Sequence, residues 1–137
     1  AHIVLDVGME YDPARNRYDH HQIEGAGERN GVPYASFGLI WKHFGYTLCG
    51  EAVAQKVEKR LVLAIDARDN GVNTSIPTDL NISDHRTGEA ISLFNPTWQE
   101  KISDTAQFMK AVAFAKEIIE REIAHARANI ESKKRFP

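Results

Sequence analysis

The chain has little cysteine and no long apolar run. Its single cysteine, Cys49, lies in a sequence of 137 residues, which excludes a disulfide framework within the chain and fits a reducing compartment. No uninterrupted apolar stretch approaches the roughly 20 residues that a membrane helix needs. We therefore expect a soluble, cytoplasmic protein with no membrane partner.

Strong net charge is also missing. The formal net charge is −2, from 17 basic and 19 acidic residues, so nothing global draws the chain to nucleic acid or to an anionic membrane. If the protein binds phosphates, local charge or a metal must provide the attraction. With 42% hydrophobic residues, the chain can bury one ordinary core, and we expect one compact unit.

The most informative segment is Asp19-His20-His21, three adjacent residues that can all ligate a metal or contact a phosphate. Two acidic stations accompany it. Asp6 follows the apolar run Ile3-Val4-Leu5, and the pair Asp66 and Asp69 lies in a segment that ends in Asn70-Gly71. Carboxylate and imidazole ligands favour ions such as Mn²⁺ or Mg²⁺ over metals that prefer sulfur.

Periodicity places these stations on elements. Residues 2–7 and 17–21 are typical of short strands, and the glycine-broken segment 25–31 indicates a mobile loop. Ser36 is expected to cap a helix that Gly45 closes, and a second helix is expected from about Glu51 to Ala64, pointing its end at Asp66. Further predictions are a loop over 71–81, a short helix over 87–94, and a long helix that starts at Ser103 or Asp104 and ends in Lys133-Lys134-Arg135.

The pattern favours phosphoester hydrolysis, which needs an activated water and neutralisation of charge on the phosphoryl group. Two divalent ions about 3.5–4 Å apart provide both. Asp6 is our candidate bridging ligand, and His20 and Asp66 would complete one metal, with Asp69 as the alternative to Asp66. Asp19 would orient an imidazole. His21, pointing the other way if the segment is extended, would meet the substrate phosphate.

The Asp19-His20-His21 tripeptide resembles the signature of the DHH phosphoesterase superfamily. More closely, the chain resembles the melanocyte-proliferating-gene-one family, formerly described as uncharacterised metal-dependent hydrolases, whose eukaryotic members are regarded as RNA exonucleases. The segments that carry this resemblance are Val4-Leu-Asp-Val-Gly-Met-Glu-Tyr-Asp-Pro13, Arg17-Tyr-Asp-His-His-Gln22, Gly38-Leu-Ile-Trp-Lys-His-Phe-Gly45, Ile65-Asp-Ala-Arg-Asp-Asn-Gly71 and Asn95-Pro-Thr-Trp98.

The resemblance implies an α/β fold with a parallel-sheet core flanked by helices and metal ligands from four motifs. Asp6 matches the second motif, Asp19 to His21 the third, and Asp66 the fourth. The family's opening His-x-Gly-x-Phe-His-x-Asp-Glu segment and its second half are absent here. We therefore expect residues 1–137 to be a partial catalytic domain, with strands and metal motifs in 1–71 and a helical remainder in 72–137, and to be inactive alone.

The leading hypothesis is a two-metal nuclease acting on single-stranded RNA or DNA. A phosphohydrolase of small substrates, such as a dinucleotide or pyrophosphate, is the enzymatic alternative. The other alternative is a non-catalytic binding or homo-oligomerisation module, in which the long helix supplies the partner surface and the polar cluster is vestigial. Trp41 and Trp98 are more often core residues than base-stacking ones, and Asp84-His85 is better explained as a loop hydrogen bond than as a metal pair.

Overall fold

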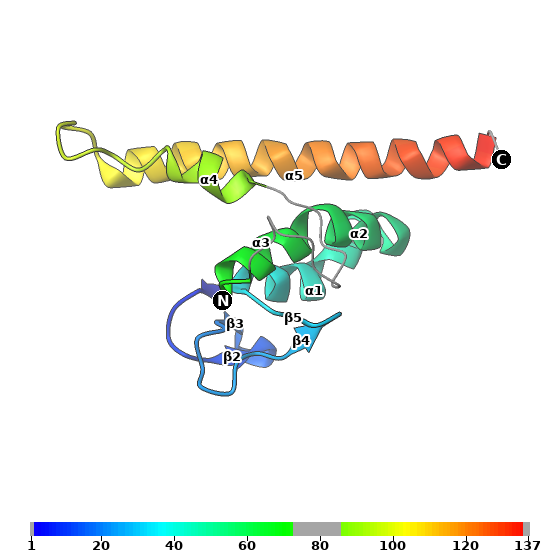
Figure 1. Cartoon of the computed structure of the whole chain (residues 1–137), viewed down its shortest axis with the longest axis horizontal. Coiled ribbons are helices and arrows are strands. Elements are labelled where there is room, and N and C mark those ends of the chain that lie inside the picture. Colours follow the sequence, from blue (N-terminus) through cyan, green and yellow to red (C-terminus); the bar gives the residue numbers. More distant parts are fainter. Residues whose placement is uncertain (1, 73–85, 136–137) are drawn as a thin grey trace. The chain divides into compact units, whose positions relative to one another are not determined.

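The computed structural model describes residues 2–72 and 86–135 and is a mixed fold of a small sheet and mostly helices (Figure 1). The chain divides into two compact units, residues 1–85 and 86–137. All the residues expected at the site belong to the first unit.

The first unit begins with a three-stranded sheet in the order β1-β3-β2. Strand β1 (Val4–Leu5) pairs in parallel with β3 (Arg17–Tyr18), and β2 (Tyr11–Asp12) pairs with β3 in antiparallel fashion. A 3₁₀ turn, η1 (Pro13–Arg15), joins β2 to β3. Because β1 and β3 are parallel neighbours, the residues that follow them, Asp6 and Asp19, emerge at the same sheet edge.

A hairpin over residues 28–33 overlaps the segment 25–31, where a mobile glycine loop is expected. Strand β4 (Glu28–Arg29) pairs with β5 (Val32–Pro33) in antiparallel fashion. The connecting residues Asn30 and Gly31 both have positive φ, 53° and 75°, as a two-residue hairpin turn requires. The prediction of a loop was wrong here because the Asn-Gly turn signal was overlooked.

Helix α1 (Ser36–Cys49) is longer than expected. Gly45 does not end it. A Cβ on Gly45 would lie 2.9 Å from the Trp41 ring, so glycine is needed there for close packing. The helix ends at Cys49 and is followed by Gly50, whose φ is 83°. Ser36 is the first helical residue and not the cap, and its hydroxyl is directed to the site described below.

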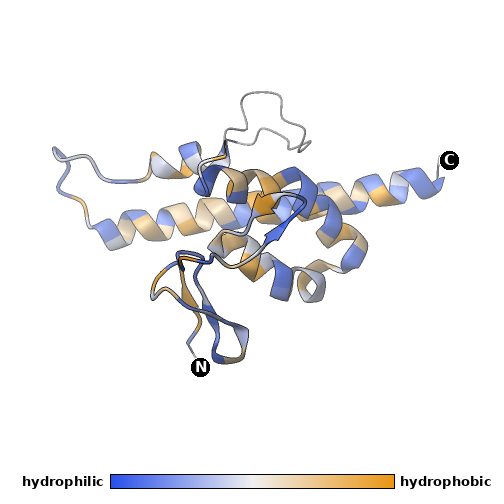
Figure 2. Ribbon diagram, turned by 60° about the horizontal axis from the view of Figure 1, so that its bottom comes forward, coloured by the Kyte–Doolittle hydropathy of each residue, from blue (hydrophilic) through white to orange (hydrophobic). Residues whose placement is uncertain are grey.

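The second expected helix also continues further than predicted. Helix α2 (Glu51–Val57) leads through a π-helical stretch, η2 (Glu58–Val62), into α3 (Leu63–Asp69). Asp66 is therefore inside a helix, and Asp69 is its last residue. Apolar residues of these helices and of β5 form the core of the unit, as the orange segments in Figure 2 indicate; the fully buried ones include Val32, Leu39, Val57, Leu61, Val62, Ala64 and Ala67.

The second unit contains α4 (Thr87–Ser92) and α5 (Asp104–Arg135). The rings of Phe94 and Phe114 lie 5.4 Å apart and join the end of the short helix to the long one. Both helices were expected close to these bounds, whereas the expected loop over 71–81 and the pair Asp84-His85 fall wholly or mostly outside the described residues. Within the described part of the chain, no helix is both long enough and apolar enough to cross a membrane.

Candidate metal centre

Asp6 occupies a special backbone position directly after β1. Its φ is 57°, a left-handed conformation that aspartate tolerates better than most residues. Its main-chain N–H still donates to Tyr18 O at 3.2 Å, which prolongs the pairing of β1 with β3. The carboxylate is 60% exposed and accepts a hydrogen bond from Ser36 Oγ at 3.1 Å, so most of its lone pairs face solvent.

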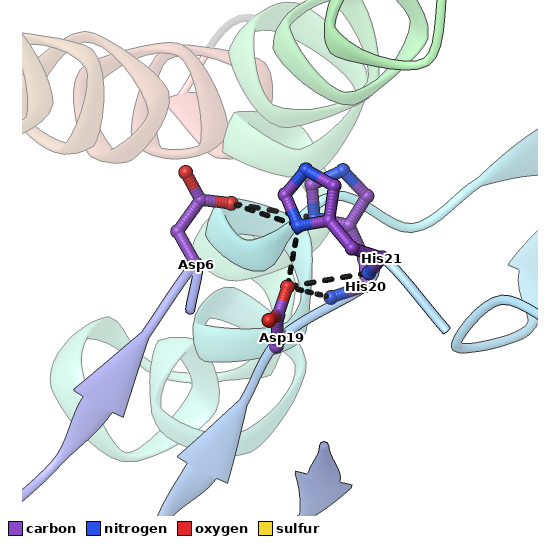
Figure 3. A group of neighbouring side chains, drawn as sticks. All are labelled: Asp6, Asp19, His20 and His21. Carbon is purple, nitrogen blue, oxygen red and sulfur yellow. Dashed lines mark hydrogen bonds and ion pairs between the residues drawn. The ribbon is translucent and has the colours of Figure 1, made fainter. Parts of the chain in front are cut away.

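Asp19 is buried and fully engaged in hydrogen bonds (Figure 3). Its Oδ1 accepts from His21 Nδ1 at 2.6 Å and from the main-chain N–H groups of His20 and His21, and its Oδ2 accepts from Met9 N at 2.7 Å. Burial raises the pKa of Asp19, but these donors outweigh it and hold the pKa at about 2. The side chain is therefore an anion that fixes the orientation of His21.

The rings of His20 and His21 lie on the same side of the chain, with centroids 4.2 Å apart and planes tilted by 33°. The expected opposite orientation was wrong, because residues 19–21 are not extended. Asp19 Oδ1 gathers the N–H groups of the next two residues, which turns the backbone. The hydrogen bond to Asp19 raises the pKa of His21 above its usual value, against a smaller opposing effect of desolvation.

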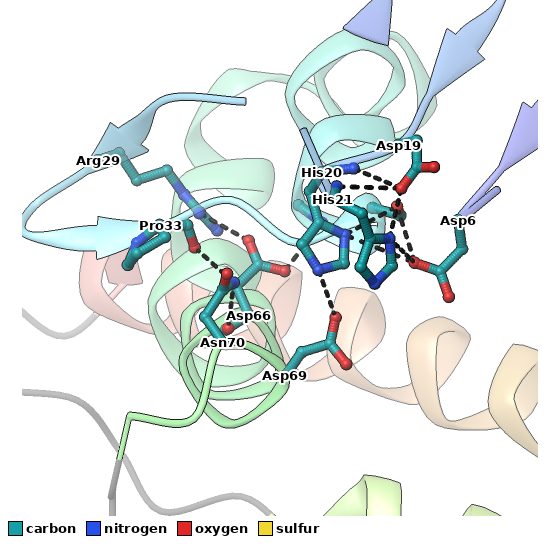
Figure 4. Close-up of polar contacts among 11 residues, drawn as sticks. Asp6, Asp19, His20, His21, Arg29, Pro33, Asp66, Asp69 and Asn70 are labelled. Carbon is teal, nitrogen blue, oxygen red and sulfur yellow. Dashed lines mark hydrogen bonds and ion pairs between the residues drawn. The ribbon is translucent and has the colours of Figure 1, made fainter. Parts of the chain in front are cut away.

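His20 lies between two carboxylates (Figure 4). Its Nδ1 is 3.2 Å from Ser36 Oγ and 3.5 Å from Asp6 Oδ1, and its Nε2 is 3.3 Å from Asp69 Oδ2. The His20 side chain is only 8% exposed, whereas that of Asp69 is 52% exposed. Each ring nitrogen of His20 thus faces an accessible carboxylate.

Asp66 lies in a different environment. Its Oδ2 accepts from Arg29 Nη1 at 2.7 Å, its Oδ1 accepts from Gly38 N at 3.0 Å, and the residue is fully buried. Burial raises its pKa to about 6 despite the neighbouring Arg29 guanidinium. Arg29 also pairs with Glu58. A Cβ on Gly38 would overlap the Asp66 carboxylate, so the close approach of α1 to α3 depends on this glycine.

The structure therefore brings Asp6, Asp19, His20, His21 and Asp69 together and directs Asp66 to Arg29. The expectation that Asp66 follows the helix end failed because the helix runs one turn further. Sequence reasoning also missed Ser36, Arg29 and Gly38. Ser36 carried a signal, a serine at a helix start, but it was interpreted as a cap, and nothing local in the sequence pairs Arg29 with Asp66.

A pocket of about 330 Å³ adjoins the cluster. Asp6, Ser36 and Asp69 provide its polar side chains, and the remaining walls are apolar: Leu5, Ala35, Phe37, Ile40 and Ile65. Because the exposed carboxylates of Asp6 and Asp69 line this pocket, a ligand in the pocket could reach the cluster.

The chemistry of the donors fits a divalent cation. One donor atom from each of Asp6, Asp19, His20 and His21 lies within 4.8 Å of the others. Two donors that are each about 2.1 Å from one ion, at about 90–110° to each other, lie about 3.0–3.4 Å apart. The distance of 3.3 Å between His20 Nε2 and Asp69 Oδ2 falls in this range. Oxygen and imidazole donors without sulfur suit Mn²⁺, Mg²⁺ or Zn²⁺.

Comparisons with known proteins agree with one another. The family model MYG1_exonuc, described as "Uncharacterised protein family (UPF0160)", matches residues 1–136. A MYG1 protein of Saccharomyces cerevisiae is 35% identical over 139 residues, covering 85% of this chain and 40% of the relative. The MYG1 exonuclease of Homo sapiens is 33% identical over 137 residues, covering 84% of this chain and 36% of the relative. The chain thus spans less than half the length of these relatives. No solved structure matches it.

Proposed function

The chain belongs to the MYG1_exonuc family, and on that premise we propose that its Asp-His cluster is the metal-dependent phosphodiesterase site of a nuclease for single-stranded RNA or DNA. Relatives from Homo sapiens and Rattus norvegicus carry the name MYG1 exonuclease. The observation that carries the proposal is the convergence of Asp6, Asp19, His20 and His21 within 4.8 Å.

We propose His20, through Nε2, and Asp69 as ligands of one ion, and Asp6, which lies on the Nδ1 side of the ring, as a ligand of the other. Asp6 and Asp69 are the two carboxylates with exposed oxygens, and each faces one nitrogen of the His20 ring. Asp66 is less suited because Arg29 and Gly38 already occupy both of its oxygens. Removing it from Arg29 would also leave a buried charge without its partner.

A divalent ion bound there would supply an activated water and offset negative charge on the phosphoryl group. The protein's own residues supply orientation and proton control. Asp19 holds Nδ1 of His21 at 2.6 Å, which leaves Nε2 of a half-exposed ring to face the substrate. Because the raised pKa favours the imidazolium, His21 can donate a hydrogen bond to a phosphoryl oxygen or a proton to the leaving oxygen.

Several finer features are part of the same proposal. The fold around the site is that of a DHH-type domain with a parallel core, the ion is Mn²⁺ or Mg²⁺, and two ions act together at the site. A cytoplasmic location remains a prediction. Self-association through α5 also remains one, and the exposed apolar residues Phe108, Met109 and Val112 on that helix support it.

Metal titration tests the site directly. We expect stoichiometric Mn²⁺ binding by calorimetry or electron paramagnetic resonance, and loss of that binding in His20→Ala. The matched control is His125→Ala, which removes a histidine of α5 near Arg121 and should bind Mn²⁺ normally. Equal Mn²⁺ binding by His20→Ala and the unchanged chain would refute the site.

A further inference from the structure

A second pocket of the first unit contains none of the residues of the Asp-His cluster. Its volume is about 270 Å³, and it lies where the β4–β5 hairpin, α1 and α2 meet. Its walls combine three aromatic rings, two cations, two amides and one carboxylate: Tyr34, Trp41, Tyr46, Arg29, Lys42, Asn30, Gln55 and Glu58.

Two of the three rings are already engaged. The Arg29 guanidinium lies 4.4 Å from the Tyr34 ring centroid, and Lys42 Nζ lies 4.9 Å from the same centroid. Trp41 is 5% exposed, and its Nε1 donates to Ala54 O at 3.2 Å. Tyr34 therefore anchors the two cations, and Trp41 forms a fixed wall.

Tyr46 differs from both. Its ring is 54% exposed, and no other ring in residues 2–72 or 86–135 packs on it. Its backbone is held within α1 next to Gly45, over which the Trp41 ring is packed. An exposed aromatic face is what an unstacked base requires, and the amides of Asn30 and Gln55 supply donors and acceptors for its edge.

We propose that this pocket binds one nucleobase of a single-stranded nucleic acid, stacked on Tyr46, with Lys42 Nζ directed to the adjoining phosphate. The inference rests on the proposed function and names a substrate contact for it. The volume of about 270 Å³ is just below the roughly 300–1,000 Å³ of pockets for drug-sized ligands, so one base fits in it.

The backbone connects this pocket to the metal centre over a short path. Tyr34 lies two residues before Ser36, whose hydroxyl contacts Asp6 and His20. Arg29, on the pocket wall, binds Asp66 one helical turn before Asp69. Tyr46 itself lies ten residues along α1 from Ser36, so the base site and the metal centre are separate parts of the first unit.

Fluorescence anisotropy with labelled octauridylate, in EDTA, tests the pocket without any contribution from metal. Tyr46→Ala should weaken binding by roughly five- to 150-fold, as loss of one base stack does. Tyr46→Phe, which keeps the ring, should bind within about twofold of the unchanged chain. Lys42→Gln should reduce the slope of log K against log salt by about 0.7, as the loss of one single-strand phosphate contact does. Circular dichroism establishes that each variant is folded.

The pocket and the metal site fail in distinguishable ways. His125→Ala should bind octauridylate normally in EDTA, because His125 belongs to the second unit and lines neither this pocket nor the Asp-His cluster. If Tyr46→Ala binds as well as the unchanged chain, or if the unchanged chain does not bind octauridylate, the pocket proposal is overturned, whatever Mn²⁺ does. If the pocket results hold and Mn²⁺ does not bind, the proposed function fails and the base site stands.

Discussion

Two acidic residues of helix α3, three positions apart, have opposite surroundings. Asp66 is fully buried and has both oxygens occupied by Arg29 and Gly38. Asp69 is half-exposed and faces His20 Nε2 at 3.3 Å. A carboxylate near a candidate metal centre can be a ligand only if hydrogen-bond donors of the protein do not already occupy its oxygens. Removal of a paired buried carboxylate would leave its partner charge without compensation, whereas an open carboxylate beside an imidazole has oxygens available for a cation.

The largest expected effect comes from removing the buried carboxylate. Asp66→Ala should lower the free energy of unfolding by about 3–5 kcal/mol, because it leaves the Arg29 guanidinium without one of its two partners in the interior. Asp69→Ala, the matched change in the same helix, should stay within about 0.5 kcal/mol. Urea denaturation in EDTA measures both. Equal losses for the two variants would break the comparison.

A backbone test of the same buried contact uses Gly38. Adding a methyl group there forces α1 away from the Asp66 carboxylate, so Gly38→Ala should cost about 2–3 kcal/mol of stability. Gly88, in helix α4, has nothing within 4 Å of a Cβ position, and Gly88→Ala should stabilise by up to about 1 kcal/mol. Thermal unfolding distinguishes the two; stabilisation by Gly38→Ala would show that the contact is loose.

On the open side of the comparison, Asp19 acts through the residues it orients. Asp19→Asn should weaken Mn²⁺ binding about 10–100-fold, the usual effect of losing a group that positions a ligand. The reason is that Asp19 holds the turn that places both imidazoles. Calorimetric titration of the folded variant gives the affinity. An unchanged affinity would remove Asp19 from the site.

The smallest expected effect concerns the pKa values of two histidines, which are shifted in opposite directions. In metal-free protein, the hydrogen bond to Asp19 raises the pKa of His21 above 6.5, and burial lowers the pKa of His43 below 6.5. The stabilisation from the His21–Asp19 pair is therefore complete below pH 6.5 and is lost as pH rises through the raised pKa of His21. It is also lost as pH falls from about 4 to the Asp19 pKa of about 2.

Histidine NMR resonances followed between pH 4 and 9 report both values. In Asp19→Asn the pKa of His21 should move toward that of a free imidazole, while that of His43, which contacts Tyr11 Oη at 2.8 Å, should stay where it is. A His21 pKa below 6.5 in the unchanged chain would contradict the geometry.

The sequence predicted the parts that depend on local pattern. The strand ends that carry Asp6 and Asp19, and the long helix from Asp104, follow from apolar runs and helical spacing. Helix ends were less predictable. Gly45 has a sequence typical of a stop, but it is retained inside α1 by the packing of Trp41.

The candidate site could be predicted only in part, because it too depends on contacts between residues far apart in the sequence. The choice between Asp66 and Asp69 depends on a contact across 37 positions with Arg29, which no local pattern encodes. The orientation of His21 depends on hydrogen bonds of the Asp19 side chain, which turn a segment that was expected to be extended. Such long-range contacts and side-chain hydrogen bonds decide which carboxylates remain exposed. The periodicity of the sequence carries no information on them.

The most direct test of the central claim compares Mn²⁺ binding by Asp69→Asn and Asp66→Asn, each normalised to its folded fraction. We expect at least a tenfold loss of affinity for Asp69→Asn with unchanged stability, and affinity within about threefold of the unchanged chain for Asp66→Asn with reduced stability. The reverse result, with Mn²⁺ binding lost in Asp66→Asn and kept in Asp69→Asn, would contradict it.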